Sequence, residues 1–263
     1  MSTEQLKTAI VHREEWGRGR EPFTMLETAL NENKVSHMPR FWSGLRMDWW
    51  RFAMMGPVVL TCPFVHVFGR GDEEKRFCWP AQPAPPCVVF SIGSNNQWGF
   101  ETDIIANSNC VVHVFDCTVA HPTPPASTQG RLFFYSACIG SAPGFYDLIG
   151  LTKLAHAVPT LLKMDIEGFE WEVLTNIMET SARHRRDTGE DIFPQQIAVE
   201  MHYFEASKLL SSYGRDRSPG EMFMYFQRLF QFGGYVLAER RDNMMCAFCS
   251  EILLVRAACP TYV

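Results

Sequence analysis

The stretch VVFSIGSNNQWGFETDIIANSNCVVHVFD, residues 88–116, decides the fold that we predict for this chain. It runs from an apolar segment through Gly93, Ser94 and Asn95 into a helix-like segment, and a second apolar segment then ends on Asp116. A glycine turn at a helix start lets backbone amides approach an anionic group, and a carboxylate after the next strand can accept the hydroxyl hydrogens of a ribose. The stretch therefore predicts a nucleoside-shaped pocket.

The alternation of strands and helices continues downstream. Short apolar runs predict strands at 87–92, 110–115, 131–138, 160–164, 195–201, 234–240 and 249–256, and amphipathic segments predict helices at 97–107, 144–155, 168–181 and 219–232. Such a pattern favours a mostly parallel α/β sheet of seven strands, covered on both faces. The short link between the last two strands favours an antiparallel C-terminal hairpin. Ligands of such sheets bind beyond the carboxyl ends of the strands.

The region upstream of the sheet has a different pattern. Residues 1 to about 50 space their apolar side chains at three and four, which predicts helices, and they carry Trp42, Trp49 and Trp50. These tryptophans cover a core or form a substrate-stacking surface. Because the proline-rich segment WPAQPAPPC cannot continue a helix or a central strand, we predict an N-terminal helical extension or cap over 1–86 and a main domain over 87–263.

The composition narrows the class of protein. With 263 residues, 46% of them hydrophobic, the chain can bury a full core, and its net charge of -5 offers no general attraction for nucleic acid or anionic lipid. No apolar run approaches the ~20 residues that span a bilayer, and the first residues are too polar for a secretory signal. We therefore expect a soluble, cytoplasmic protein, lumenal or secreted only if a leader has been removed, with no nucleic-acid partner.

The nine cysteines do not suggest a disulfide framework. Their number is odd, and Cys110, Cys117 and Cys138 fall in strand-like runs, which favours small buried thiols. Cys246 and Cys249 form a single CxxC without a second pair or a suitably spaced histidine, so we favour a structural role over zinc binding.

Polar residues follow five of the predicted strands. They are Gly93, Asp116, the segment 138–141, Asp165 and the segment 200–202. Neither GxGxxG nor GxxxxGK[ST] is present, which excludes a P-loop and leaves pyrophosphate without its usual cradle. These residues alone do not distinguish a nucleoside-binding site from a purely structural arrangement, in which the glycine forms a turn and an acid caps a helix.

Several motifs together resemble a known family. VVFSIGSNN, CIGSAPG, LLKMDIEGFEWEVL and QIAVEMHY, preceded by Cys62, Arg70, Gly71, Lys75 and Cys78, are similar to the FkbM-type methyltransferases over residues 60–256. The resemblance implies a Rossmann-like class I methyltransferase fold, S-adenosylmethionine as the cofactor, and methylation of a hydroxyl oxygen on a sugar or another small molecule. Two departures are Ser141, where many relatives have an acid, and a first loop that lacks a second glycine.

The resemblance also implies which residues bind the cofactor. Gly93, Ser94 and Asn95 border its methionine part, Asp116 holds the ribose, Cys138 and Ile139 flank the adenine, and Asp165 lies next to the sulfonium.

Catalysis requires a group that handles the proton of the acceptor. A hydroxyl ionises too weakly at neutral pH to react unaided, so a base or a metal ion is needed. We predict Asp165, Glu200 and His202 as the catalytic residues, with His202 as general base and Asp165 as orienting group. Alternatively, the same three side chains bind a divalent ion, manganese, iron or zinc rather than calcium. Glu167 and Glu170 are explained by the helix dipole or by N-terminal capping.

Two other functions remain open at this point. One is a nicotinamide-dependent oxidoreductase on the same kind of sheet, and the other is a non-catalytic protein that binds an adenosyl ligand or a partner. For the acceptor, which we expect to be a small molecule or a glycan, the N-terminal region and the loop 121–130 are the segments that we expect to determine specificity.

Overall fold

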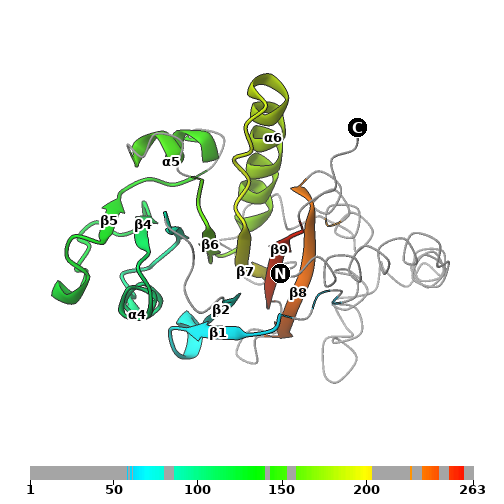
Figure 1. The fold of residues 1–263 in the computed structure, drawn as a ribbon. Coiled ribbons are helices and arrows are strands. Elements are labelled where there is room, and N and C mark those ends of the chain that lie inside the picture. The colour runs from blue at the N-terminus through cyan, green and yellow to red at the C-terminus, as the bar shows by residue number, and fades with distance from the viewer. Residues whose placement is uncertain are drawn as a thin grey trace, which may run out of the picture.

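The computed structural model of the protein describes residues 58, 60, 62–79, 86–139, 143–152, 158–202, 226, 233–242 and 249–257. Seven strands form one sheet in the order β5-β4-β3-β6-β7-β9-β8 (Figure 1). Their bounds are Val88–Ile92 (β3), Val111–Phe115 (β4), Leu132–Tyr135 (β5), Leu161–Met164 (β6), Gln196–His202 (β7), Tyr235–Asp242 (β8) and Cys249–Arg256 (β9). Strands β3 to β7 are parallel, whereas β9 is antiparallel to both β7 and β8. The predicted mostly parallel sheet and its antiparallel C-terminal hairpin are confirmed.

Helices and a small hairpin cover the two faces of the sheet. Figure 1 shows α5 (Phe145–Leu151) and α6 (Glu170–Thr188) on one side, and α4 (Gly99–Asn107) with β1 and β2 on the other. All five residues of β3 are buried, and alternate ones serve different cores, since Phe90 packs with the α5 and α6 side and Val89 with the α4 side. This two-sided burial is the reason why the strand reads as a continuous apolar run.

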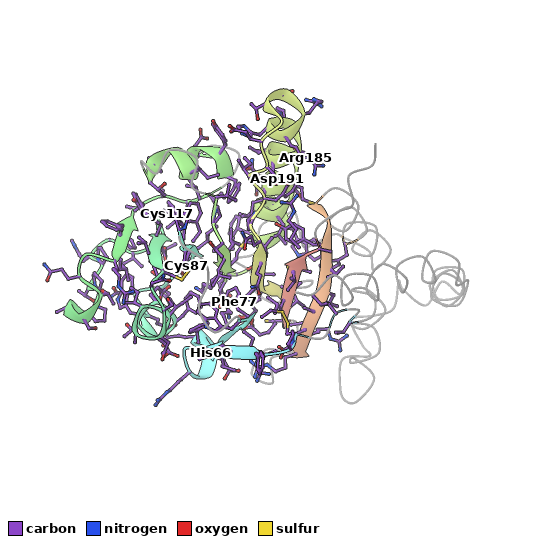
Figure 2. The ribbon with its side chains drawn as sticks, in the orientation of Figure 1. His66, Phe77, Cys87, Cys117, Arg185 and Asp191 are labelled. Carbon is purple, nitrogen blue, oxygen red and sulfur yellow. A yellow bond between two sulfur atoms is a disulfide. The ribbon has the colours of Figure 1, made fainter. Side chains whose placement is uncertain are left out.

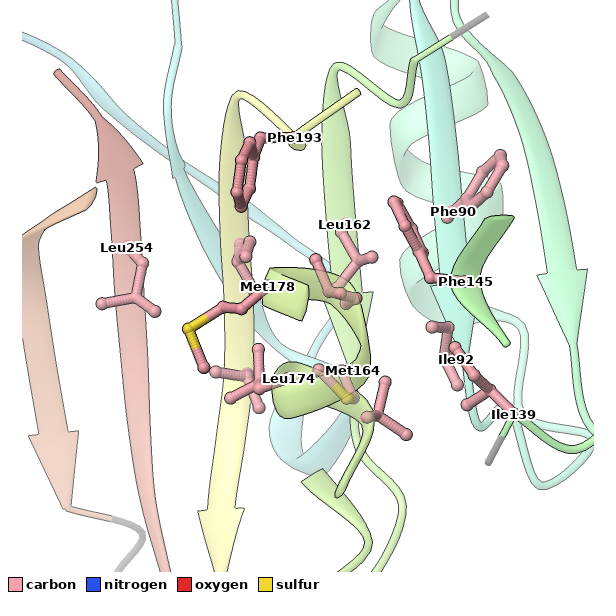
Figure 3. Packing of buried hydrophobic residues seen from close by; sticks show 14 of the residues in the cluster. Phe90, Ile92, Ile139, Phe145, Leu162, Met164, Leu174, Met178, Phe193 and Leu254 are labelled. Carbon is pink, nitrogen blue, oxygen red and sulfur yellow. The ribbon is translucent and has the colours of Figure 1, made fainter. Parts of the chain in front are cut away.

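The core on the α5 and α6 side is the larger of the two that the described residues form. In Figure 3, Leu162 and Met164 of β6 lie close to Leu174 and Met178 of α6, and Phe90 and Ile92 of β3 lie close to Phe145 and Ile139. Helix α6 ends at Gly189, which has φ 79° and donates its N–H to the carbonyl of Arg185. The helix extends seven residues beyond the predicted end, and the basic run 183–186 forms its last turns.

The described part of the N-terminal extension is a β-hairpin, not a helix. Its elements are β1 (Val65–Phe68), the short 3-10 helix η2 (Gly71–Glu73) and β2 (Lys75–Cys78); a second 3-10 helix, η3 (Ala126–Thr128), follows β4. Phe68 and Phe77 are fully buried and pack against Phe100 of α4, with ring centroids 6.3 and 6.1 Å apart. The hairpin is therefore part of the core.

Other predictions for the extension cannot be compared with the structure. Residues 1–57, including Trp42, Trp49 and Trp50, lie outside the described residues, as does most of the helix expected at 219–232. The division into 1–86 and 87–263 stays a prediction.

The expectation of buried free thiols was wrong, because disulfides join Cys62 to Cys78, Cys87 to Cys110, and Cys117 to Cys138. Cys87 and Cys110 precede the adjacent strands β3 and β4, and their Cα atoms lie 4.5 Å apart. Cys117 and Cys138 follow the adjacent strands β4 and β5, with Cα atoms 4.9 Å apart. Parallel pairing in this register brings each pair within bridging distance, and the strand register is not visible in a sequence. Figure 2 shows the side chains of Cys87 and Cys117.

Cys249 is disulfide-bonded as well, and Cys246 lies outside the described residues. Within the described ranges, no helix is long and apolar enough to cross a bilayer.

Candidate active site

A cavity of about 570 Å³ opens at the carboxyl ends of the parallel strands. It lies where the chain order of the sheet reverses, since β4 and β5 extend to one side of β3 and β6 and β7 to the other. Its wall contains all seven predicted cofactor-binding residues together with Glu200; the seven are Gly93, Ser94, Asn95, Asp116, Cys138, Ile139 and Asp165. The volume is within the usual range of sites for small molecules and cofactors.

Gly93 is required where β3 and β6 end side by side. Its φ is 79°, and a Cβ at this position would collide with the backbone carbonyl of Asp165. The turn continues without further glycines, because Asn95 and Asn96 take up left-handed backbone angles of 47° and 58°. Asparagine tolerates this conformation better than most residues. The missing second glycine is thus replaced by two asparagines.

Asp116, the carboxylate at the end of β4, closes this loop. One of its oxygens accepts the N–H groups of Ser94 and Asn95, each at 2.8 Å, and the other accepts the N–H and hydroxyl of Thr118 at 2.8 and 2.6 Å. Burial alone would raise the pKa of Asp116, but these hydrogen bonds outweigh burial and lower it. The carboxylate is ionised and faces the cavity with both oxygens engaged, and its contact with a ribose stays a prediction.

The start of α4 is occupied by an acid from the N-terminal hairpin. Glu73 of η2 accepts the N–H of Gly99, the first residue of the helix. A helix N-terminus is where phosphate groups commonly bind, and here the chain's own carboxylate takes that place. The sequence did not point to Glu73, because its partner is 26 residues away.

The cavity wall is strongly acidic. Seven carboxylates line it, and Lys163 is the one cation among its described lining residues; the acids are Asp72, Glu73, Glu101, Asp116, Asp165, Glu167 and Glu200. Such a concave acidic surface attracts cations and repels anions.

Asp165 forms an ion pair with a buried lysine of the N-terminal hairpin. Lys75 of β2, whose side chain is fully buried, donates to Asp165 at 3.3 Å and to Glu251 of β9 at 2.6 Å. Burial alone would lower the pKa of Lys75, but the charges of Asp165 and Glu251 raise it. Burial would likewise raise the pKa of Asp165, yet Lys75, Lys163 and His202 lower it, so Asp165 is ionised at neutral pH. The sequence indicated Lys75 only as part of a motif.

His202 lies beside the cavity, behind Glu167. Its Nε2 is 3.5 Å from the Glu167 carboxylate, and its Nδ1 is 3.0 Å from Oε1 of Glu170. Burial alone would lower the pKa of His202, but the hydrogen bond and charge of Glu170, with the charges of Glu200 and Asp165, raise it to about 9. The imidazole therefore carries a proton at neutral pH. It is the one predicted site residue that does not line the cavity.

Glu170 organises the segment between β6 and α6. The same Oε1 that contacts His202 accepts the N–H groups of Ile166 at 3.0 Å and Gly168 at 3.2 Å. Both amides belong to the turn before α6, and no side-chain hydrogen bond caps the helix at Phe169, so Glu170 fixes this turn instead of capping the helix as predicted. Between Ile166 and Gly168, Glu167 has a left-handed φ of 55°. This backbone conformation, uncommon for a non-glycine residue, directs an exposed carboxylate toward the cavity and His202.

Three of these side chains have the arrangement of a metal site. Asp165, Glu167 and His202 each offer one ligand atom, and the three atoms lie within 4.8 Å of one another. Glu167 thus stands where we had predicted Glu200. A second group combines Glu200 and His202 with Cys249, but the sulfur of Cys249 is in a disulfide.

The sheet order and the cavity at its switch point define a Rossmann-like class I methyltransferase fold. A family model described as "Methyltransferase domain" matches residues 11–256. The chain belongs to this methyltransferase family. No curated protein matches the chain.

Solved structures of methyltransferases are similar to the chain at low sequence identity. The FkbM methyltransferase from Methylobacillus flagellatus KT is 15% identical with a TM-score of 0.38, and the match covers 64% of this chain and 43% of that one. CalO1, a methyltransferase in calicheamicin biosynthesis solved with adenosylhomocysteine, is 16% identical with a TM-score of 0.34, and the match covers 68% of this chain and 50% of that one. A 16S rRNA methyltransferase from Catenulisporales acidiphilia is 13% identical with a TM-score of 0.40, and the match covers 83% of this chain and 96% of that one. The chain thus spans less than half the length of the FkbM protein.

Proposed function

We propose that the protein transfers the methyl group of S-adenosylmethionine to a hydroxyl of a small molecule or glycan. The observation that carries this proposal is the charge of the cavity, where seven carboxylates face one lysine. S-adenosylmethionine carries a sulfonium and an ammonium against a single carboxylate, and so has a net positive charge. A preorganised acidic wall stabilises such a ligand.

The same charge disfavours a nicotinamide-dependent oxidoreductase. A dinucleotide brings a pyrophosphate with two negative charges, which needs free backbone amides at a helix N-terminus. Glu73 occupies that position on α4, and further acids surround it. A non-catalytic adenosyl-binding protein remains the second candidate, because the same cavity could bind the cofactor without turnover.

In the methyl transfer, the hydroxyl oxygen attacks the methyl carbon, the carbon–sulfur bond breaks, and sulfur keeps the electron pair as a neutral thioether. The hydroxyl proton must pass to a base. We assign this role to Asp165, because it is ionised and lines the cavity, with Glu200 as its neighbour in the wall. The sequence-based hypothesis of His202 as base would require His202 first to lose the proton that Glu170 stabilises. His202 serves here as a cation that positions Glu167.

A metal-assisted version has its own support. The ring of His202 is fixed at Nδ1 by Glu170, which is how metal-ligating histidines are commonly oriented, and Nε2 faces Glu167. One imidazole and two carboxylates suit manganese, iron or zinc, which would bind and acidify the acceptor hydroxyl. Titration of chelator-treated protein with manganese, followed by electron paramagnetic resonance, tests this version. Binding that persists unchanged in Glu167→Gln would contradict it.

The compartment also follows from chemistry. We propose that the protein works in an oxidising environment rather than in the cytoplasm, since disulfides such as Cys62–Cys78 and Cys87–Cys110 persist mainly outside reducing compartments. The cytoplasmic expectation rested on the polar first residues and on the lack of a long apolar run, and it did not include these disulfides. Mass spectrometry of alkylated protein from its native cells tests this, and free thiols at these cysteines would contradict it.

Calorimetry tests the main proposal. Purified protein is titrated with S-adenosylmethionine, adenosylhomocysteine and a nicotinamide dinucleotide, and labelled methyl transfer is measured on a panel of hydroxyl acceptors. We expect binding of both adenosyl ligands and not of the dinucleotide. Asp165→Asn should retain binding of adenosylhomocysteine, whose sulfur is uncharged, and lower turnover about 100-fold or more. Absence of adenosyl binding would overturn the proposal, and binding without transfer to any acceptor would favour the non-catalytic candidate.

A further inference from the structure

Three polar side chains form a small cluster in the otherwise apolar layer between the sheet and α4. Ser91 of β3 and Lys163 of β6 are register partners on adjacent strands, and Glu101 projects from α4. Their exposed fractions are 0%, 6% and 1%. The surrounding residues Val89, Phe100, Ile104 and Leu161 belong to the hydrophobic core of this face. Burial of polar groups costs free energy unless they are paired, so this cluster needs a reason.

Pairing within the cluster is incomplete. The hydroxyl of Ser91 donates to Oε1 of Glu101 at 2.5 Å, and the ammonium of Lys163 donates to the carbonyl of Gly93. Oε2 of Glu101 is buried and has no hydrogen-bond partner among the described residues. An orphaned buried carboxylate oxygen is costly in a native protein. Because Glu101 and Lys163 both line the cavity, the missing partner can come from a ligand.

We propose that Glu101 and Lys163 form the subsite for the amino-acid end of the cofactor. Oε2 of Glu101 accepts a hydrogen bond from the ligand's α-ammonium, and Lys163 donates to its α-carboxylate. A zwitterion thereby meets a carboxylate and an ammonium in matching order, and both buried charges are paired. This inference rests on the proposed function, because it assigns one end of the same cavity.

The location of the pair also sets the direction of the ligand. Lys163 contacts the loop at Gly93, at the junction of β3 and β6, whereas Cys138 and Ile139 line the cavity after β5, at the far edge of the sheet. The methionine part then lies between β3, α4 and β6, and the adenosine part extends toward β5. Burial raises the pKa of the Glu101 carboxyl, against the opposing charge of Lys163, and an adjacent ammonium would favour its ionised form.

Two ligands that differ only at the amino-acid end make a sharp test. Adenosylhomocysteine and 5′-methylthioadenosine are both uncharged at sulfur, but only the first has the amino-acid group. In the wild-type protein we expect adenosylhomocysteine to bind at least about tenfold more tightly by calorimetry. Glu101→Gln keeps the shape of the side chain and removes its charge. It should weaken adenosylhomocysteine by about tenfold or more and change the affinity for methylthioadenosine less than about twofold.

Two further variants complete the design. Glu179→Gln, an exposed change of the same kind on α6, is the matched control and should leave both affinities unchanged. Lys163→Met should weaken adenosylhomocysteine more than its decarboxylated analogue, which has the ammonium but no carboxylate. Because Lys163 also contacts Gly93, the ratio of the two affinities is the readout.

The outcomes separate the subsite from the function. If wild-type protein binds neither adenosyl ligand, the proposed function fails. If it binds both equally well, or if Glu101→Gln leaves the preference for adenosylhomocysteine unchanged, the subsite is overturned and the function stands. An equal loss of both ligands in a Glu101→Gln protein that melts normally would assign Glu101 a purely structural role, and if that variant does not fold, the wild-type comparison of the two ligands decides.

Discussion

Glu170 shows how one side chain can position several others. Its carboxylate is fully buried, accepts two backbone N–H groups of the loop between β6 and α6, and contacts the ring of His202. A sequence reader sees only an acid in the first turn of a helix. The hydrogen bonds to Ile166 and Gly168 make it the group on which the position of Glu167 depends.

Glu170→Ala should therefore destabilise the protein by about 3 kcal/mol, because it leaves a buried imidazolium and two backbone amides without their acceptor. Urea unfolding at neutral pH measures the change. Glu172→Ala, two residues further along the same helix and partly exposed, is the control and should cost under about 1 kcal/mol. Equal effects of the two substitutions would contradict the role of Glu170.

His113 controls a pH dependence of stability. It is buried on β4, contacts the Tyr135 hydroxyl at 3.1 Å, and burial lowers its pKa from 6.5 to about 4. The unfolded chain binds a proton below pH 6.5, whereas the folded protein does not until about pH 4. Stability contributed by neutral His113 is thus complete above pH 6.5 and falls as the pH drops through this window, by about 3 kcal/mol in total.

His113→Phe should flatten this part of the profile, since phenylalanine does not titrate and fits among Phe90 and Phe133. The measurement is the free energy of unfolding in urea at several pH values between 4 and 7. His121→Gln, at an exposed position, should leave the slope as in the wild type. An unchanged slope in His113→Phe would show that the pKa of His113 is the same in the folded and unfolded protein, which would contradict this role.

At the level of elements, the hairpin β1–β2 does more than cover the sheet. Through Lys75 it supplies the cation that pairs with Asp165 and Glu251. Arg76, the next residue, also makes ion pairs, with Glu74 and Glu239, but it lies at the surface with 32% of its side chain exposed. Lys75 and Arg76 therefore allow a buried ion pair and a partly exposed ion pair to be compared within the same strand.

Lys75→Met should cost about 3 kcal/mol or more, because two carboxylates lose their buried partner, whereas Arg76→Met should cost under about 1 kcal/mol. Thermal and urea unfolding of both variants measure this difference. Turnover should also fall in Lys75→Met, since Asp165 loses the donor that orients it. Comparable stability of the two variants would mean that Lys75 is not needed to hold the acids.

At the scale of the whole molecule, two of the disulfides lie at opposite ends of the parallel strands. Cys87–Cys110 is buried where β3 and β4 begin, whereas Cys117–Cys138 is exposed and forms part of the cavity wall where β4 and β5 end. Their sequence separations, 23 and 21 residues, are nearly equal. The effect of each on the unfolded chain should therefore be similar, at about 3 kcal/mol.

The two bonds should differ in their effect on the site. Replacement of Cys117 and Cys138 by serine should lower the affinity for adenosylhomocysteine severalfold, because the wall after β4 and β5 is no longer tied. The same replacement of Cys87 and Cys110 should lower stability and leave that affinity within about twofold. Calorimetry and urea unfolding of the two double variants test this, and mild reductant should open the exposed bond first. If the two double variants bind adenosylhomocysteine with equal affinity, a role of Cys117–Cys138 in the site is contradicted.

Much of this architecture could be predicted from the sequence. The strand residues 88–92 and 111–115 were recognisable because parallel strands buried on both faces form continuous apolar runs. Gly93, Asp116 and Asp165 were recognisable because each directly follows such a run, and the carboxyl ends of parallel strands meet at one edge. The hairpin at 65–78 was missed, since the domain boundary was placed at the prolines that follow it.

The sequence by itself thus determined the order of elements in the main sheet, the edge of that sheet where the cavity lies, and eight residues of the cavity wall, because these depend on local periodicity and on chain direction. Only the tertiary structure decided the disulfide pairing, the lysine beneath Asp165 and the protonation of His202. Each depends on contacts between segments far apart in the chain, as with Lys75 and Glu251, which are separated by 176 residues. Burial and neighbouring charge set the pKa of a side chain, and neither is encoded within its own stretch of sequence.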